Sequence, residues 1–229
     1  RIKYFTYDNN QNITSYTDAT GARRYYSYNA KGQLVAESDE NASGSSLASF
    51  FGTDNGFNST KHVRLLGDVS GDGMDDLVAF GDDGVWVALA NGNVTGDAFN
   101  APTLWVSEFA YNAGGWRVES HPRFLADVNG DGKKDIVGFG ATRVAVSLSR
   151  GTSFTPPTIW MADDLTIGQG WQTTKHVRGM GDVNGDGKED IIAIGDSQTF
   201  VALSTGTSFS TKQVWISSQA FTYNGTWRV

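Results

Sequence analysis

The 229-residue sequence contains no cysteine and only four prolines. Without cysteine, neither a disulfide framework nor a thiolate metal site can form. Few prolines combined with 28 glycines favour tight turns between short strands over a collagen-like or proline-rich chain. The sequence also lacks any apolar run near the roughly 18 residues that a membrane span requires. A chain of this length can bury a sizeable core, as one large β domain or as a small array.

Positive charge is also in short supply. Lysine and arginine together number 18 against 25 acidic residues, which gives a formal net charge of -7. Because an acidic chain is repelled by phosphate groups, we expect no nucleic-acid partner. The opening Arg1-Ile2-Lys3 has no signal-peptide pattern, and we interpret the sequence as part of a longer protein.

A nine-residue segment with the pattern Asp-Val-(Ser/Asn)-Gly-Asp-Gly-x-x-Asp occurs three times, at residues 68–76, 127–135 and 182–190. The segments start 59 and 55 residues apart, and each is preceded by a His-x-Arg triplet with an aromatic residue before it. Trp227 repeats the aromatic position once more, so we expect a partial fourth repeat. Self-similarity at a fixed period indicates a repeat architecture.

Each repeat contains four short apolar runs separated by Gly, Asn, Asp and Ser, as strands and turns require. In the second repeat these runs are residues 123–127, 136–139, 144–148 and 158–161. Four strands in each repeat of this length are typical of a β-propeller blade. The alternative is a linear β-solenoid, but its coils are shorter and do not need four turns. The sequence therefore predicts an all-β fold with about three blades of four antiparallel strands.

The first 40 residues follow a different pattern. Two tyrosine-rich segments, 7–13 and 28–34, repeat at a spacing of 21 residues and flank Gly- and Asn-containing turns. This pattern predicts a run of β-hairpins over residues 1–40. Residues 41–47 have the Ser- and Gly-rich composition of a linker, and we expect the propeller blades to occupy residues 48–229.

Each nine-residue loop presents side-chain oxygens at positions one, three, five and nine, and a backbone carbonyl at position seven. Glycine at position six allows the sharp turn that a loop around an ion needs. Hard oxygen ligands at alternate positions suit Ca²⁺, which takes six to eight of them, so we predict up to three calcium ions. The predicted ligands are Asp68, Ser70, Asp72, the Met74 carbonyl and Asp76; Asp127, Asn129, Asp131, the Lys133 carbonyl and Asp135; and Asp182, Asn184, Asp186, the Lys188 carbonyl and Asp190.

Other interpretations of these loops are weaker. An EF-hand needs a glutamate at position twelve and flanking helices, whereas position twelve here is Ala79, Gly138 or Ala193 and the flanks are strand-like. The alternative is that the loops are plain solvated acidic turns, although the ligand spacing is kept in all three. If calcium binds, three equivalent ions indicate a structural role in tying the turns of the blades together.

The aromatic and histidine positions are candidates for ligand binding. Trp116 with His121, and Trp171 with His176, recur at identical offsets beside glycine-rich turns. An indole next to polar donors suits a sugar ring, which has both C–H faces and hydroxyl groups. The alternative is that the tryptophans pack between blades and the histidines bond buried carbonyls.

Two further expectations follow from the repeats. The other repeated tryptophans, Trp105, Trp160 and Trp215, lie inside apolar runs and are expected in the core. Catalysis is not expected, because every histidine belongs to the repeat and no acid–base pair is set apart from it.

The loops, each ending in Asp-(Ile/Leu) and an apolar strand, resemble FG-GAP/VCBS repeats, the calcium-loop blades of integrin α-chain propellers and of many secreted microbial proteins. The aromatic, the His-x-Arg triplet and Phe-Gly at 80–81 and 139–140 are similar to the mushroom lectin family of Psathyrella velutina type. That resemblance implies binding of N-acetylglucosamine-type glycans in pockets between blades, and calcium in the loops. It covers about residues 48–229.

Residues 4–39 resemble RHS/YD repeats, the strand hairpins of large secreted bacterial toxins and cell-surface proteins. The pairing of the two repeat types implies an exported or cell-surface bacterial polypeptide. We therefore predict a non-catalytic, Ca²⁺-stabilised, lectin-like propeller module, and the alternative is a structural or protein-interaction scaffold. Three blades cannot close a ring, so further blades or a second copy are expected to complete it.

Overall fold

The computed structural model describes residues 4–7, 13–17, 23–28, 34–39, 50–93 and 98–217. The chain forms two compact units, residues 1–55 and 56–229. The predicted linker, 41–47, lies outside the described residues. Within the described part, no helix is long and apolar enough to cross a bilayer.

The first unit is a meander of β-hairpins, as predicted. Its four strands pair in sequence order, and every pairing is antiparallel. A single turn of 3-10 helix, η1 (Thr53–Asn55), follows near the end of the unit. The strands are β1 (Tyr4–Tyr7), β2 (Ile13–Thr17), β3 (Arg23–Tyr28) and β4 (Leu34–Asp39).

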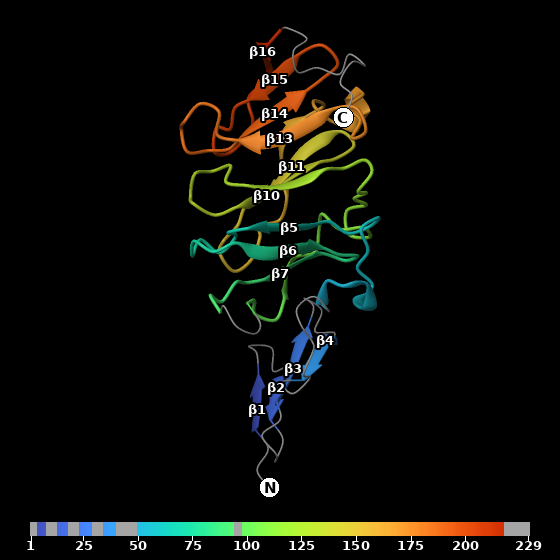
Figure 1. Cartoon of the computed structure of the whole chain (residues 1–229), viewed down its shortest axis with the longest axis vertical. Coiled ribbons are helices and arrows are strands. Elements are labelled where there is room, and N and C mark those ends of the chain that lie inside the picture. Colours follow the sequence, from blue (N-terminus) through green and yellow to red (C-terminus); the bar gives the residue numbers. More distant parts are fainter. Residues whose placement is uncertain are drawn as a thin grey trace. The chain divides into compact units, whose positions relative to one another are not determined.

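The second unit contains three sheets of four antiparallel strands, which confirms the predicted blades (Figure 1). Each sheet is a simple meander, and every predicted strand of the second repeat overlaps an observed one. The 3-10 helix η2 (Ile167–Gln169) lies between the second and third sheets. Blade one is β5 (Arg64–Gly67), β6 (Asp76–Phe80), β7 (Val85–Ala88) and β8 (Thr103–Val106); blade two is β9 (Arg123–Ala126), β10 (Asp135–Phe139), β11 (Arg143–Ser147) and β12 (Thr158–Ala162); blade three is β13 (Val177–Gly181), β14 (Asp190–Ile194), β15 (Thr199–Ala202) and β16 (Gln213–Ile216).

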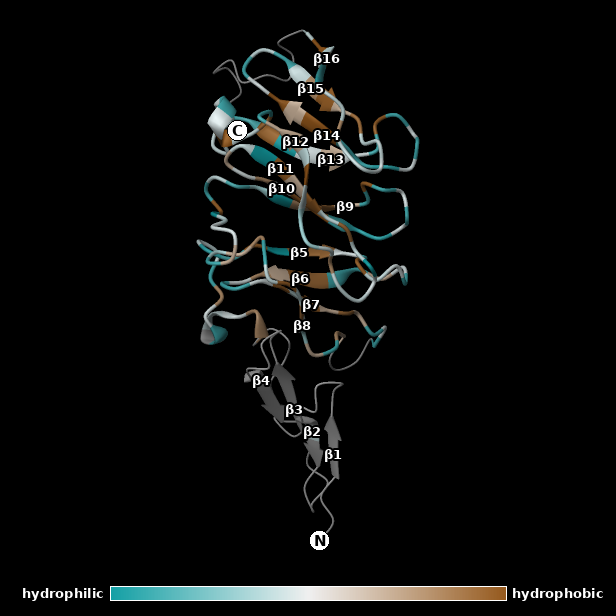
Figure 2. Ribbon diagram, turned by 180° about the vertical axis from the view of Figure 1, so that it is seen from behind, coloured by the Kyte–Doolittle hydropathy of each residue, from teal (hydrophilic) through white to brown (hydrophobic). Residues whose placement is uncertain are grey.

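The two core clusters of this unit lie between blades rather than within one. Every residue of β10 is buried, because the middle strand of blade two has a neighbouring blade on each face. Hydrophobic residues run along the strands, and hydrophilic residues occupy many of the loops (Figure 2). Sheets that are apolar on both faces need a neighbour on each side, which is the packing of a propeller.

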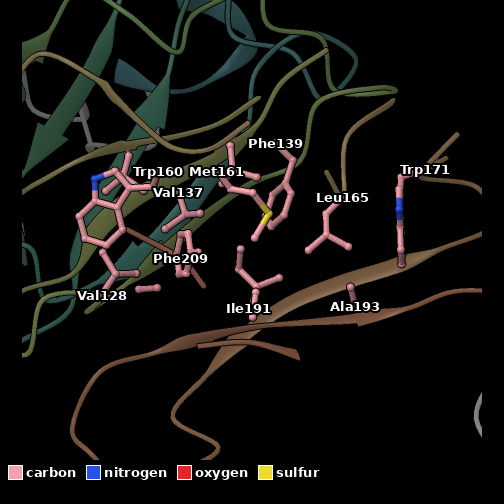
Figure 3. Packing of buried hydrophobic residues seen from close by; sticks show 14 residues of the cluster. Val128, Val137, Phe139, Trp160, Met161, Leu165, Trp171, Ile191, Ala193 and Phe209 are labelled. Carbon is pink, nitrogen blue, oxygen red and sulfur yellow. The ribbon is translucent and has the colours of Figure 1, made fainter. Parts of the chain in front are cut away.

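A tryptophan–phenylalanine contact repeats at both junctions. The Trp105 ring of blade one lies 5.2 Å from Phe154 of blade two, and Trp160 of blade two lies 5.4 Å from Phe209 of blade three (Figure 3). In each pair the phenylalanine N–H also donates to the tryptophan carbonyl, at 3.3 and 3.1 Å. Blades one and two therefore each add their outer-strand tryptophan to the core of the following junction.

Hydrogen bonds between the nine-residue loops reinforce each junction. The hydroxyl of Ser149 in blade two donates to the carbonyl of Val69 in blade one, and Ser204 repeats this bond to Val128. The N–H of loop position eight donates to the carbonyl of position one of the preceding loop, at 2.8 and 2.7 Å. These bonds fix the step from one blade to the next.

Blade three ends with the same groups uncovered. Trp215 is 47% exposed, whereas Trp105 and Trp160 are 6% exposed. Likewise Val183 is 37% exposed, and its counterparts in the first two loops are fully buried. The expectation that all three tryptophans are in the core is therefore correct for two and wrong for Trp215, because no following phenylalanine covers it in the described residues.

Replacing Trp160 by alanine is expected to lower the free energy of unfolding by about 3–5 kcal/mol, because it empties the second junction. The matched Trp215→Ala change removes an exposed ring and is expected to cost less than about 0.5 kcal/mol. Urea unfolding of both variants measures the difference. An equal loss of unfolding free energy in the two variants would contradict the assignment of Trp160 to the core of the blade junction.

Candidate functional site

The nine-residue loops fold around their first aspartate. In the second loop, Asp127 accepts hydrogen bonds from the N–H groups of Gly130, Asp131 and Gly132, at 2.7, 3.2 and 2.8 Å. Glycines at positions four and six have positive φ, 78° and 83° in this loop, which other residues rarely adopt. In the third loop the equivalent N–H groups, with Gly187 first, lower the pKa of Asp182.

The ninth aspartate has a different environment, because it is buried. Asp135 accepts hydrogen bonds from the N–H of Val128 at 3.2 Å and from that of Ser149 at 2.7 Å. It thus connects its own loop to the segment after the third strand of the blade. Burial raises the pKa of Asp135 to about 7, and it also raises the pKa of Asp76 and of Asp190. None of the three forms an ion pair with the described residues.

Position seven adds a cation in two loops. The Lys133 ammonium lies 3.3 Å from the Asp131 carboxylate, and Lys188 lies 3.0 Å from Asp186. The lysine lowers the pKa of Asp186. In the first loop Met74 takes this position, so Asp72 has no lysine of its own loop beside it.

The donor set of each loop fits Ca²⁺ in kind, with carboxylates, an amide or hydroxyl, and a carbonyl within nine residues. In this structure, however, the carboxylates at positions one and nine already accept hydrogen bonds from backbone N–H groups of the loop. Among the described residues, no three His, Asp or Glu side chains gather as a metal site would require. Calcium binding therefore stays a prediction.

The three repeated histidines are held in the same way. Each Nδ1 accepts a hydrogen bond from the backbone N–H four residues before it, at 3.1, 3.2 and 3.1 Å. This bond places the proton of the neutral ring on Nε2. In blade three, Nε2 of His176 then meets Asp196 at 3.2 Å, and that carboxylate also pairs with Lys175. Blade one has the same three groups, namely Lys61, His62 and Asp82.

His121 of blade two lacks these partners. Ala141 stands where the other blades have aspartate, and Ser120 stands where they have lysine. Nε2 of His121 consequently has no hydrogen-bond partner in the described part of the chain. Burial, followed by the charge of Arg123, lowers the pKa of His121 below its usual 6.5, so the ring is neutral at pH 7.

A cavity of about 610 Å³ lies beside this histidine, at the junction of blades one and two. Trp116 forms part of its wall and is itself 7% exposed, with its ring 5.7 Å from that of His121 and 5.0 Å from that of Phe109. The cavity is lined by the segment between β8 and β9, by the turn after β10, and by β11 and the start of β12. The lining residues are Glu108, Phe109, Gly114, Gly115, Trp116, His121, Gly140, Ala141, Thr142, Arg143, Ala145, Pro157, Thr158 and Ile159.

The two predicted tryptophan–histidine pairs have different surroundings in the structure. Trp116 and His121 line the cavity, whereas Trp171 is buried against Phe200 and His176 bonds Asp196. All three histidines keep an aromatic neighbour, with Phe57 in the place of the tryptophan in blade one.

Sequence reasoning missed the charged residues of the cavity wall, Glu108 and Arg143. Neither side chain has a hydrogen-bond or ion-pair partner among the described residues. The available signal was the departure of blade two from the other repeats: Arg143 replaces Gly84 and Gln198, and Ala141 replaces an aspartate.

The chain is similar to known proteins in its N-terminal residues and in its fold. A family model for RHS repeats matches residues 7–44. The fold is similar to that of a lectin from Agrocybe aegerita, described as recognising non-reducing terminal N-acetylglucosamine, with 28% identity and a TM-score of 0.68. That match covers 89% of this chain and 54% of the lectin, so the chain spans about half of the lectin's length.

A second solved structure shares the fold at lower identity. It belongs to the Tc holotoxin pore of Photorhabdus luminescens, with 18% identity and a TM-score of 0.54 over 91% of this chain and 9% of the toxin chain. No curated protein sequence matches the chain.

Proposed function

We propose that the second unit is a non-catalytic glycan-binding module and that the cavity beside Trp116 and His121 is its sugar site. The observation that carries this proposal is the unpaired Nε2–H of His121, a residue that lines a cavity of the volume typical of small-ligand pockets. The similarity to a lectin that recognises terminal N-acetylglucosamine supports the same ligand class.

The chemistry of the cavity wall suits a sugar. Ile159 is 60% exposed and offers apolar surface for a C–H face of a pyranose ring; Trp116, which is 7% exposed, lines the cavity beside it, whereas Phe109 is fully buried. Glu108 accepts hydrogen bonds from hydroxyl groups, and Arg143 donates to hydroxyl or acetamido oxygens. Because both side chains lack protein partners in the described residues, a ligand would not have to break existing bonds to reach them.

Arg143→Ala and Glu108→Gln are each expected to weaken binding of an N-acetylglucosamine-terminated oligosaccharide by roughly tenfold, or about 1.4 kcal/mol. Gln198→Ala, at the position of Arg143 in blade three, is the matched control and should leave affinity unchanged. Isothermal titration calorimetry measures the affinities, and NMR follows the Nε2–H of His121, which should shift on binding.

A well-folded protein that binds no oligosaccharide on a glycan array would contradict the sugar site. That result would favour the alternative function, a structural or protein-interaction scaffold, for which the RHS match supplies the supporting observation. Binding that is unchanged in both wall variants would place the sugar elsewhere on the molecule.

We also propose that the three loops are calcium loops of the FG-GAP/VCBS type, holding up to three Ca²⁺ as structural ions. Their identical place between the first and second strands of each blade supports this. The buried carboxylates of Asp76, Asp135 and Asp190, which have no cationic partner among the described residues, supply negative charge for an ion to balance. Bound calcium would supply a cross-link within each loop, and the loops themselves contact one another at the blade junctions.

Millimolar Ca²⁺ is expected to raise the melting temperature relative to EGTA, because an ion that binds only the folded state stabilises it by about 2.7 kcal/mol at a hundredfold excess over Kd. Asp131→Asn should remove part of this gain. Asp163→Asn changes the same charge outside the loops and should keep it. Equal melting temperatures in Ca²⁺ and EGTA would contradict the proposal.

The exposed edge of blade three is the place where we propose that the ring continues. Among the described residues, Trp215 is 47% exposed and the Val183 carbonyl accepts no side-chain hydrogen bond, whereas a following blade contacts the equivalent groups at the other two junctions. The occupant is a further blade of the same repeat, with serine and phenylalanine at the positions of Ser149 and Phe154. Blade one of a second copy is the poorer fit, since Ala90 occupies that serine position.

Joining a further copy of residues 163–217 in register after residue 217 is expected to shield Trp215 from acrylamide quenching. The Trp215→Phe variant of each protein isolates the signal of this ring. Unchanged quenching in the extended chain would overturn the proposal. A dimer of the original chain that shields Trp215 would assign the edge to a second copy instead.

An exported or cell-surface bacterial protein is the proposed setting for this module. The RHS match at residues 7–44 and the fold shared with a bacterial toxin chain support it.

A further inference from the structure

Blade two differs from its neighbours at the centre of the cavity wall. Ala145 lies in β11, the third strand of blade two. The equivalent residue is Trp86 in blade one and Phe200 in blade three. The three residues occupy the same register, because each pairs with the fourth residue of the strand before it. A side chain that ends at Cβ therefore replaces a large aromatic ring in this blade alone.

In blade three the aromatic ring occupies the equivalent space. The Phe200 ring lies 6.1 Å from the Trp171 ring, with the two planes at 74°, and the Lys212 ammonium lies 5.3 Å from the Phe200 ring centre. In blade two the same direction from the strand opens into the cavity, which Ala145 and Trp116 both line. The cavity thus exists where the ring is missing.

The histidines of the two junctions also differ in the hydrogen bonding of Nε2. In blade three, Asp196 bonds His176 Nε2 and pairs with Lys175, so the ring nitrogen that would face a ligand is already used. In blade two, Ala141 cannot make this bond, and the lysine is absent as well. The two changes occur together, which leaves no unpaired charge behind.

We propose that the residues at positions 145 and 141 determine which blade junction binds a sugar. Ala145 opens the space and Ala141 frees His121, whereas Phe200 and Asp196 close the equivalent junction at His176. This inference rests on the proposed glycan-binding function. It assigns a single sugar site to the three blades, although the tryptophan–histidine motif is present at both junctions.

The gain-of-site experiment uses Phe200→Ala combined with Asp196→Ala. Titration calorimetry with an N-acetylglucosamine-terminated disaccharide should give a single binding event per wild-type chain and a second one in this double variant. Phe200→Ala alone is the control, and it should bind less well at the new site, because Asp196 still holds His176.

The loss-of-site experiment uses Ala145→Phe and Ala141→Asp. Each is expected to reduce affinity by at least about tenfold. Ala141 is exposed, so Ala141→Asp leaves the core intact even if the larger phenylalanine at residue 145 prevents folding. Circular dichroism and the melting temperature report on the fold of each variant.

The outcomes separate the two proposals. If the wild-type chain binds no sugar, the proposed function fails. If it binds two sugars with similar affinity, or if folded Ala141→Asp and Ala145→Phe bind as tightly as the wild type, the sugar-binding function stands and the assignment of these positions is overturned. Unchanged stoichiometry in the folded double variant would also overturn it.

Discussion

The requirement that each sheet bury both faces against a neighbouring blade governs the whole second unit. Trp160 shows how this is met, because its ring completes the core of a junction whose other half, Phe209, belongs to the next blade. Hydrogen bonds between the loops of successive blades also fix the position of each blade relative to the one before it, so packing and hydrogen bonding repeat together. A blade without a following neighbour must expose what the others bury, as Trp215 does.

The candidate site depends on the same junctions. The segment between β8 and β9 crosses from one blade to the next and places Trp116 and His121 at the junction of blades one and two. Its backbone holds the histidine through Nδ1, so the ring presents Nε2 to whatever lies on the other side. Whether that is an aspartate or open space is decided by residues of the following blade, which is how a repeated scaffold can support a site at one junction and pure packing at another.

Much of the fold could be predicted from the sequence, because blade strands and turn glycines recur at a fixed period. The repeat also made Trp116 and His121 candidates for ligand binding, but it gave Trp171 and His176 the same standing. The two pairs differ because Ala145 and Ala141 end at Cβ where blade three has Phe200 and Asp196, and this departure is visible only when the repeats are compared position by position. The exposure of Trp215 was missed for a related reason, since periodicity describes what a blade contains and not which neighbour covers it.

A crystal structure of the protein with an N-acetylglucosamine-terminated disaccharide would locate the sugar. We expect sugar density between Trp116, His121 and Arg143, with Nε2 of the histidine within hydrogen-bond distance of a sugar oxygen, and none beside Phe200. Sugar density at the Trp171–His176 junction, or only on a surface away from both blade junctions, would contradict the assignment of the site.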